Sequence, residues 1–237
     1  MIRAVLFDAG ATLVHPDRPV EEVYARELAR DGCAASPSEL AAALGRTWEE
    51  VRRESAPNRY GGVRGEGAFW RVFLDRVRGC LDGGRVSEEA FARLAGHFRD
   101  PASWVVYPDV AGTLDALAQS GLALAVVSNW DSHLPRLLDA LDLSRRFAAL
   151  AVSAIEETGK PDPEIFHRAC ARVGVAPAEA LHVGDSLAED YEGARAAGLA
   201  ALLLDRHGLY PEVADRIASL EDLLADSRLR RVLSSAH

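Results

Sequence analysis

The 237-residue chain is 49% hydrophobic and 27% charged, a composition typical of a soluble globular protein with a sizeable apolar core. Its formal net charge of −9 argues against a general nucleic-acid binder, because such a protein needs a basic face. No apolar run reaches the length of a membrane span, and the first residues lack a signal-peptide pattern. We therefore expect a cytoplasmic protein that contacts neither nucleic acid nor membrane.

The first predicted element is a strand. The apolar run Ala4–Phe7 ends at Asp8-Ala9-Gly10, which is typical of a buried parallel strand that opens into a loop of small residues. Four segments with apolar residues at helical spacing then follow without an intervening strand: Val20–Arg30, Pro37–Glu54, Gly67–Leu81 and Ser87–Phe98. These helices could pack on the sheet, but about 80 residues without a strand are unusual in a βα alternation. We expect residues 16–101 to form an all-helical cap.

Strands and helices alternate in the rest of the chain. Predicted helices cover Val110–Gln119, Ser132–Leu141, Asp162–Val173 and Leu187–Ala197. Predicted strands cover Ala123–Val127, Leu150–Ser153, Leu181–Val183 and Ala200–Leu204. Continuous apolar strands that alternate with helices indicate an α/β fold with a doubly wound, Rossmann-like parallel sheet. This core would comprise residues 1–15 and 102–237.

Polar residues follow each of these strands. The first strand leads to Asp8, the next to Ser128-Asn129, the third to a turn with Lys160, and the fourth to Asp185, with Asp190 five residues later. Singly, each residue could cap a helix or a turn. Together they would meet at one sheet edge, where ligands of such sheets bind. Crowded carboxylates require a cation, and hard oxygen ligands favour Mg²⁺, which normally binds together with phosphate.

Lys160 is unusual in the composition of the chain. It is the single lysine among 27 Lys and Arg residues, and it lies in a turn bracketed by Gly159 and Pro161. A lysine ends in a compact ammonium, whereas arginine carries a wide planar fork. Chance placement has odds of about 1 in 27 if all basic positions are equivalent. We therefore expect Lys160 to place a point charge among the carboxylates.

Four motifs together resemble those of the haloacid dehalogenase-like hydrolase superfamily over nearly the whole chain. In chain order they are Phe7–Leu13, Val127–Asn129, Gly159–Pro163, and Gly184–Asp190 running into Gly193–Gly198. The helical insert after the first motif resembles the cap of the subfamily whose cap follows the first strand. The resemblance implies a hydrolase with this fold and a small-molecule substrate, such as a phosphorylated metabolite.

The resemblance also implies residue roles. Asp8 would be the nucleophile that carries the transferred group as an acyl intermediate. Asp8, the backbone carbonyl of Gly10 and Asp185 would hold Mg²⁺, with Asp190 as a further ligand or an orienting group. Lys160 would neutralise the phosphate and the nucleophile. Substrate oxygens would be bound by Ser128 and Asn129 and by the segment after Asp8, with Ala9, Gly10 and Thr12.

Gly10 departs from the family's phosphatase pattern. Phosphatases of the superfamily usually carry an aspartate there, which serves as general acid and base, and glycine has no side chain to protonate a leaving group. Two alternatives therefore stay open: a metal-independent 2-haloacid dehalogenase, whose halide leaving group needs no proton, and a catalytically impaired phosphate-binding protein. His15 is a candidate replacement donor, although a simple loop histidine explains it as well.

The cap offers further candidates for substrate contact. The polar, glycine-containing turn Asn58-Arg59-Tyr60-Gly61-Gly62 and the aromatic Trp70 could face the site, although an ordinary turn between helices is an equally good interpretation. Three cysteines, Cys33, Cys80 and Cys170, are far apart and in no metal-ligand spacing. Their spacing predicts reduced, buried thiols.

Overall fold

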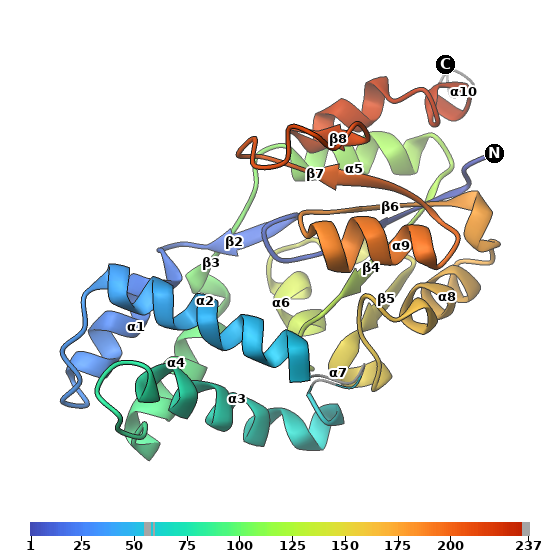
Figure 1. Ribbon diagram of the computed structural model, residues 1–237. Coiled ribbons are helices and arrows are strands. Elements are labelled where there is room, and N and C mark those ends of the chain that lie inside the picture. Colours follow the sequence, from blue (N-terminus) through green and yellow to red (C-terminus); the bar gives the residue numbers. More distant parts are fainter. Residues whose placement is uncertain (55–57, 59, 234–237) are drawn as a thin grey trace.

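The fold is built on a six-stranded parallel sheet, shown in Figure 1. The computed structural model describes residues 1–54, 58 and 60–233. The strand order is β5-β4-β1-β6-β7-β8. The strands are β1 (Ala4–Phe7), β4 (Ala123–Ser128), β5 (Ala149–Val152), β6 (Ala180–Gly184), β7 (Ala200–Leu204) and β8 (Arg216–Ile217). The predicted α/β class with a parallel sheet is confirmed.

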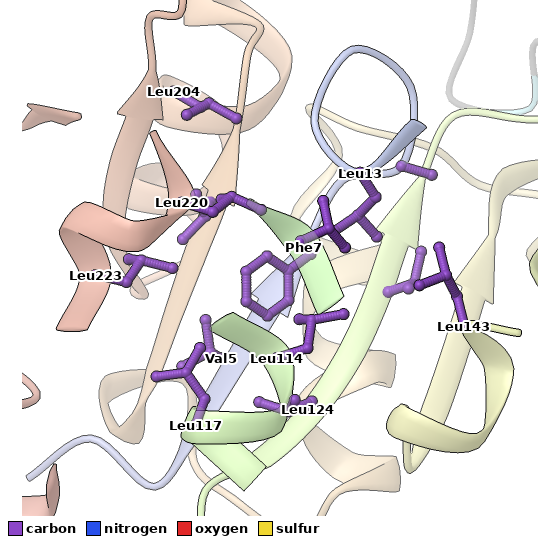
Figure 2. Close-up of a cluster of buried hydrophobic side chains, with 14 of the residues drawn as sticks. Val5, Phe7, Leu13, Leu114, Leu117, Leu124, Leu143, Leu204, Leu220 and Leu223 are labelled. Carbon is purple, nitrogen blue, oxygen red and sulfur yellow. The ribbon is translucent and has the colours of Figure 1, made fainter. Parts of the chain in front are cut away.

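Helices cover both faces of the sheet, which explains why its strands are continuous apolar runs. Because alternate side chains of a strand point to opposite faces, Val5 and Phe7 of β1 join one apolar cluster and Ala4 and Leu6 join another. Figure 2 shows Phe7 among leucines of the covering helices. The first face is covered by α5 (Val110–Gln119), α6 (Leu134–Ala140) and η5 (Leu220–Ala225), and the second by α8 (Pro163–Arg172) and α9 (Gly193–Ala196).

Four helices between β2 and β3 form a separate layer beside the sheet (Figure 1). They are α1 (Val20–Ala29), α2 (Pro37–Glu54), α3 (Gly62–Gly79) and α4 (Glu88–Arg99). They pack around an apolar cluster of their own, in which Leu28, Leu40, Phe73 and Leu94 are almost completely buried. These side chains come from all four helices, so the layer has its own core.

The helix α3 begins at Gly62, so the predicted start at Gly67 was wrong. Glycine lowers helix propensity, and the first turn of α3 contains Gly62 and Gly65. A local side-chain bond accompanies the start, because the amide of Gly62 donates to Asn58 Oδ1 at 3.0 Å. A β-carbon on Gly62 would lie 2.7 Å from Glu157 Oε1, next to α7 (Ser153–Glu156). Glycine thus allows close packing of α3 on the core.

A short antiparallel ribbon connects the helical layer to the sheet domain. It pairs β2 (Val14–Pro16) with β3 (Trp104–Val106), and neither strand was predicted from the sequence. Three residues are too few to show an alternating pattern, and the pairing joins segments about 90 residues apart. Trp104 also donates from its indole nitrogen to Phe98 O of α4 at 2.9 Å. The ribbon therefore anchors the last helix of the layer.

The predicted helix over Leu187–Ala197 is confirmed, but its first half is a π-helix and not an α-helix. Residues Leu187–Glu192 form a π-helical segment, η4, and only Gly193–Ala196 is α-helical. Ser186 accepts the amide of Glu189, and its own amide donates to Asp190 Oδ2 at 3.0 Å. These side-chain bonds hold the segment in a wider turn.

The remaining elements are η1 (Pro101–Ser103), η2 (Ser144–Arg146), η3 (Pro177–Glu179) and α10 (Arg230–Leu233).

Two expectations from composition can be compared with the structure. In the described part of the chain, no helix is both long and apolar enough to cross a membrane. All three cysteines are free thiols, as expected, but only Cys33 and Cys170 are buried. Cys80 is exposed because it follows the last turn of α3, so the prediction of three buried thiols was wrong for this residue.

Candidate active site

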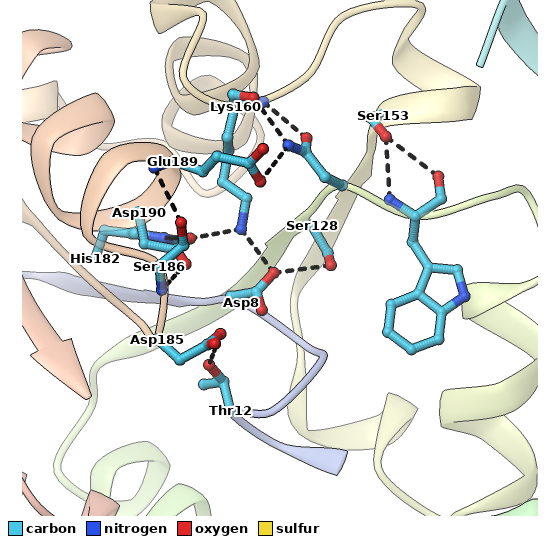
Figure 3. Close-up of polar contacts among 12 residues, drawn as sticks. Asp8, Thr12, Ser128, Ser153, Lys160, His182, Asp185, Ser186, Glu189 and Asp190 are labelled. Carbon is cyan, nitrogen blue, oxygen red and sulfur yellow. Dashed lines mark hydrogen bonds and ion pairs between the residues drawn. The ribbon is translucent and has the colours of Figure 1, made fainter. Parts of the chain in front are cut away.

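Asp8 occupies the centre of the candidate site because β1 lies between β4 and β6. The carboxyl ends of these strands place Ser128 on one side of Asp8 and Asp185 on the other (Figure 3). Ser128 Oγ donates to Asp8 Oδ1 at 2.9 Å, and Lys160 Nζ donates to the same oxygen at 2.6 Å. No hydrogen bond from the described residues reaches Asp8 Oδ2. That oxygen is therefore available to an electrophile.

Lys160 is a buried cation shared by two carboxylates. Its Nζ lies 2.6 Å from Asp8 Oδ1 and 2.5 Å from Asp190 Oδ1, and only 3% of the residue is exposed. Burial alone would lower the pKa of Lys160, but the carboxylates of Asp190 and Asp8 raise that pKa above its ordinary value. The ammonium therefore remains charged, as its unusual place in the composition suggested.

Asn129 holds the backbone of Lys160. Asn129 Nδ2 donates to Lys160 O at 2.8 Å, and Asn129 Oδ1 accepts the amide of Lys160 at 2.8 Å. Asn129 Nδ2 also donates to Glu189 Oε2 at 2.8 Å. The side chain that was expected to bind substrate oxygens is thus already bonded to the lysine turn and to η4. This arrangement orients the ammonium toward Asp8.

Asp190 is the most heavily bonded carboxylate of the site. Its Oδ1 accepts from Lys160 and from His182 Nε2 at 2.8 Å, and its Oδ2 accepts the amide of Ser186. Burial alone would raise the pKa of Asp190, but Lys160 and His182 together hold it below its usual range. Burial lowers the pKa of His182, so the neutral ring donates from Nε2. A β-carbon on Gly184 would lie 2.3 Å from Asp190 Cγ, so glycine is required there.

Three carboxylates form a cluster that fits a metal ion. Asp8, Asp185 and Asp190 each offer an oxygen within 4.8 Å of the others. Burial and the neighbouring carboxylates raise the pKa of Asp185 to about 7, and burial raises the pKa of Asp8 as well. Among the described residues, Lys160 is the cation that is paired with these carboxylates, so their negative charge is only partly compensated there. A hard divalent cation matches this all-oxygen donor set.

The loop after Asp8 turns back sharply onto β2. Ala9 is fully buried, and Gly10 forms an isolated bridge to β2. Ala11 adopts a positive φ of 55°, in the left-handed region that side chains rarely adopt. The turn brings Thr12 back toward the carboxylates, with Thr12 Oγ1 3.5 Å from Asp185 Oδ1. The loop of Ala9, Gly10, Ala11 and Thr12 therefore lies between Asp8 and the ribbon.

The helical layer contacts the site at one of the expected positions, Tyr60, and Trp70 packs behind it. Tyr60 donates from its hydroxyl to Asn129 O at 3.4 Å, and the ring of Trp70 packs against Tyr60 with centroids 6.0 Å apart. Arg59 lies outside the described residues. The sequence did not predict a second, stronger contact. Glu66 of α3 accepts hydrogen bonds from both the amide and the hydroxyl of Ser132 at 2.8 Å. The helical layer is thus hydrogen-bonded to the loop that follows β4.

The His15 ring is held in one orientation by two contacts. Its Nδ1 lies 2.7 Å from the carbonyl of Pro16, and its ring packs against Tyr107 with centroids 4.5 Å apart. The carbonyl only accepts, so Nδ1 carries the proton in this contact. The ribbon therefore fixes both the orientation and the tautomer of the candidate proton donor.

Three residues of the site were not singled out from the sequence. His182 was hidden within a strand, where a histidine among apolar residues is usually a core residue. Glu189 precedes Asp190 in a predicted helix and was taken only as part of the fourth motif. Trp130 follows Asn129 directly, and its ring contacts Gly10. The polar residue in an apolar strand was the one signal that could have indicated His182.

Comparison with known proteins agrees with this geometry. The family model for haloacid dehalogenase-like hydrolases matches residues 2–198. The chain belongs to this family of hydrolases. Haloacid dehalogenase-like hydrolase domain-containing protein 3 of Danio rerio is 32% identical to the chain, with 86% of each sequence covered.

Two further proteins that are similar to the chain carry names that differ in chemistry. The phosphoserine phosphatase of Thermus thermophilus is 34% identical, over 89% of this chain and 91% of that protein. A solved structure described as a dehalogenase superposes with a TM-score of 0.69 and is 26% identical, over 94% of this chain and 96% of the other. Proteins of both names thus share this fold, so the choice between them depends on the residues of the site.

Proposed function

We propose that the chain is a Mg²⁺-dependent phosphohydrolase that acts on a small phosphate ester through an aspartyl-phosphate at Asp8. The observation that carries the proposal is the cluster of Asp8, Asp185 and Asp190, in which Asp8 and Asp190 are buried and share the ammonium of Lys160. A phosphoryl group in transfer requires positive charge around its oxygens, and a carboxylate cluster supplies the place for the second cation. The name of the phosphatase relative supports the same reaction.

In the proposed reaction Asp8 Oδ2 attacks phosphorus while the bond to the leaving oxygen breaks, and that oxygen departs with the bonding electrons. Lys160 and Ser128 hold Oδ1 at 2.6 and 2.9 Å, so the free oxygen points toward the substrate in a fixed orientation. A water molecule then attacks the aspartyl-phosphate, which releases phosphate and restores Asp8. Asn129 contributes by holding the Lys160 turn.

The donor set indicates which residues would hold the metal. Asp8, Asp185 and the backbone carbonyl of Gly10 are the proposed ligands, and Asp190 ligates or orients through the bonds that fix its carboxylate. When bound, Mg²⁺ would supply Lewis-acid charge to the phosphoryl oxygens. Without such a cation, the three carboxylates would repel an anionic substrate.

We also propose that residues 16–101 act as the cap and that residues 1–15 and 102–237 form the catalytic core. The separate apolar cluster of the four helices and the two-stranded ribbon support this division. The contacts of Tyr60 and Glu66 with the loop after β4 support a position of the cap next to the substrate.

A metal-independent 2-haloacid dehalogenase is the second candidate, and Gly10 is the observation that favours it. A halide needs no proton when it leaves, so an enzyme without an acid at residue 10 would lose nothing. The carboxylates of Asp185 and Asp190 favour the phosphohydrolase instead, because they would repel a haloacid unless a cation bound them.

The test is phosphate release from a panel of phosphorylated metabolites and aryl phosphates, with Mg²⁺ and with chelator. Activity should need Mg²⁺ and disappear in Asp8→Asn, whereas Asp142→Asn, at an exposed aspartate, should retain it. Chloride release from 2-chloropropionate in excess chelator would refute the phosphohydrolase and establish the dehalogenase. Binding of Mg²⁺ and phosphate with no turnover of any ester would indicate the impaired binding protein instead.

A further inference from the structure

The ring of Trp130 occupies the space in which a side chain on residue 10 would begin. A β-carbon placed on Gly10 would lie 3.1 Å from Trp130 Cζ3, 3.8 Å from Cε3 and 4.0 Å from Cη2. The backbone of Gly10 does not adopt a positive φ, so its conformation does not require glycine. The proximity of the indole is therefore the reason that the structure offers for a glycine at this position.

Trp130 is held firmly in this place. Its amide donates to Ser153 Oγ at 3.1 Å, and its carbonyl accepts from the amide of Ala154 at 3.2 Å. Its ring packs on Trp104 of the ribbon, with centroids 4.9 Å apart. Because both the backbone and the ring are fixed, the indole cannot easily swing away from Gly10. The residue is only partly buried.

The leaving group of the proposed reaction departs on the side of this ring. Asp8 stands at the carboxyl end of β1 with the sheet behind it, so in-line displacement sends the leaving oxygen away from the sheet. The loop that begins at Asp8 borders that side, and the indole of Trp130 lies next to the position of a side chain on residue 10 of this loop. Of the described residues, Gly10 and Trp130 thus offer an aromatic ring and no acid at this place.

We propose that Trp130 determines substrate specificity by contacting an aromatic leaving group, so that the preferred substrates are aryl phosphates. This inference rests on the proposed phosphohydrolase function. The bond between phosphorus and the phenolic oxygen breaks as the bond from Asp8 Oδ2 forms, and the phenolate keeps the electron pair. A phenolate leaves without a proton, which agrees with glycine at position 10. Its ring gains an edge or face contact with the indole.

The experiment compares phenyl phosphate with acetyl phosphate in the wild type and in Trp130→Leu. Neither leaving group needs a proton, but only phenyl phosphate has a ring. Trp130→Leu should raise KM for phenyl phosphate about tenfold, the value of one aromatic contact, and leave KM for acetyl phosphate nearly unchanged. Trp130→Phe, which keeps a ring, should retain most of the preference. Equal changes for both substrates, or none, would overturn the role of Trp130.

A second measurement needs no variant that might fail to fold. Phenylphosphonate and methylphosphonate cannot be hydrolysed, and their inhibition constants report binding alone. The wild type should bind phenylphosphonate more tightly, and equal binding would overturn the proposed aromatic contact. Failure of every phosphate ester to react, with the phosphonate preference present, would instead overturn the phosphohydrolase and leave the aromatic contact in place.

Discussion

Replacement of Lys160 tests the charge balance of the site. Lys160→Met keeps the length of the side chain and removes the ammonium, whereas Lys160→Arg keeps the charge in a wider group. The first variant asks how much the cation stabilises the buried carboxylates. The second asks whether the compact shape of the ammonium is required, as expected from the single lysine of the chain.

The expected loss follows from the contacts. Lys160 Nζ lies 2.6 Å from Asp8 and 2.5 Å from Asp190, and the side chains of Lys160 and Asp190 are each only 2% exposed. Removal of one partner of a buried ion pair destabilises by about 3–5 kcal/mol, so Lys160→Met should lose about this amount. Lys160→Arg must fit a guanidinium into the same space, and overpacking costs about 1–3 kcal/mol. Both should lose hydrolysis.

Urea unfolding at neutral pH, followed by far-UV circular dichroism in the presence of chelator, measures these losses. The chelator matters because a bound cation would relieve the carboxylate repulsion in Lys160→Met. Arg53→Met is the matched control: its exposed pair with Glu49 should contribute less than about 0.5 kcal/mol. A Lys160→Met protein within about 1 kcal/mol of the wild type would refute the charge balance described for this site.

Three further substitutions test individual contacts. Gly184→Ala should lower the free energy of unfolding by about 3 kcal/mol, because its β-carbon would meet Asp190 Cγ at 2.3 Å. Gly112→Ala is the control, because no atom lies within 4 Å of the new β-carbon in α5, and it should raise the free energy of unfolding by about 1 kcal/mol. Equal changes for Gly184→Ala and Gly112→Ala in urea unfolding would contradict the steric reason. Glu66→Ala should lower the free energy of unfolding by about 1 kcal/mol, because the partly buried amide and hydroxyl of Ser132 lose their acceptor. An unchanged urea midpoint would contradict this reason. Burial alone would raise the pKa of Asp109, but a guanidinium partner and two further donors hold it below the unfolded value. The stabilisation that Asp109 contributes is therefore present above the unfolded pKa and is lost as the pH falls through the folded pKa. Asp109→Asn should reduce the loss of melting temperature at acid pH, and an unaltered pH dependence of the melting temperature would refute this role.

The fold class and most of the residues around Asp8 could be predicted from the amino-acid pattern. Apolar runs that end in polar residues identify parallel strands, and backbone geometry brings the carboxyl ends of such strands to one edge. This is why Ser128 and Lys160, which are 120 and 152 residues from Asp8, could be expected beside it. The boundaries of the cap and the chemical roles of these residues stay predictions.

The atoms that meet at the site follow from the three-dimensional packing and not from a local pattern. The strand order puts β1 in the middle, and side-chain packing then turns Asn129 toward the lysine backbone and His182 toward Asp190. The contact of Trp130 with Gly10 joins residues 120 positions apart and leaves no local pattern in the sequence. Local propensity and periodicity report on near neighbours along the chain, whereas these contacts depend on the relative placement of whole elements.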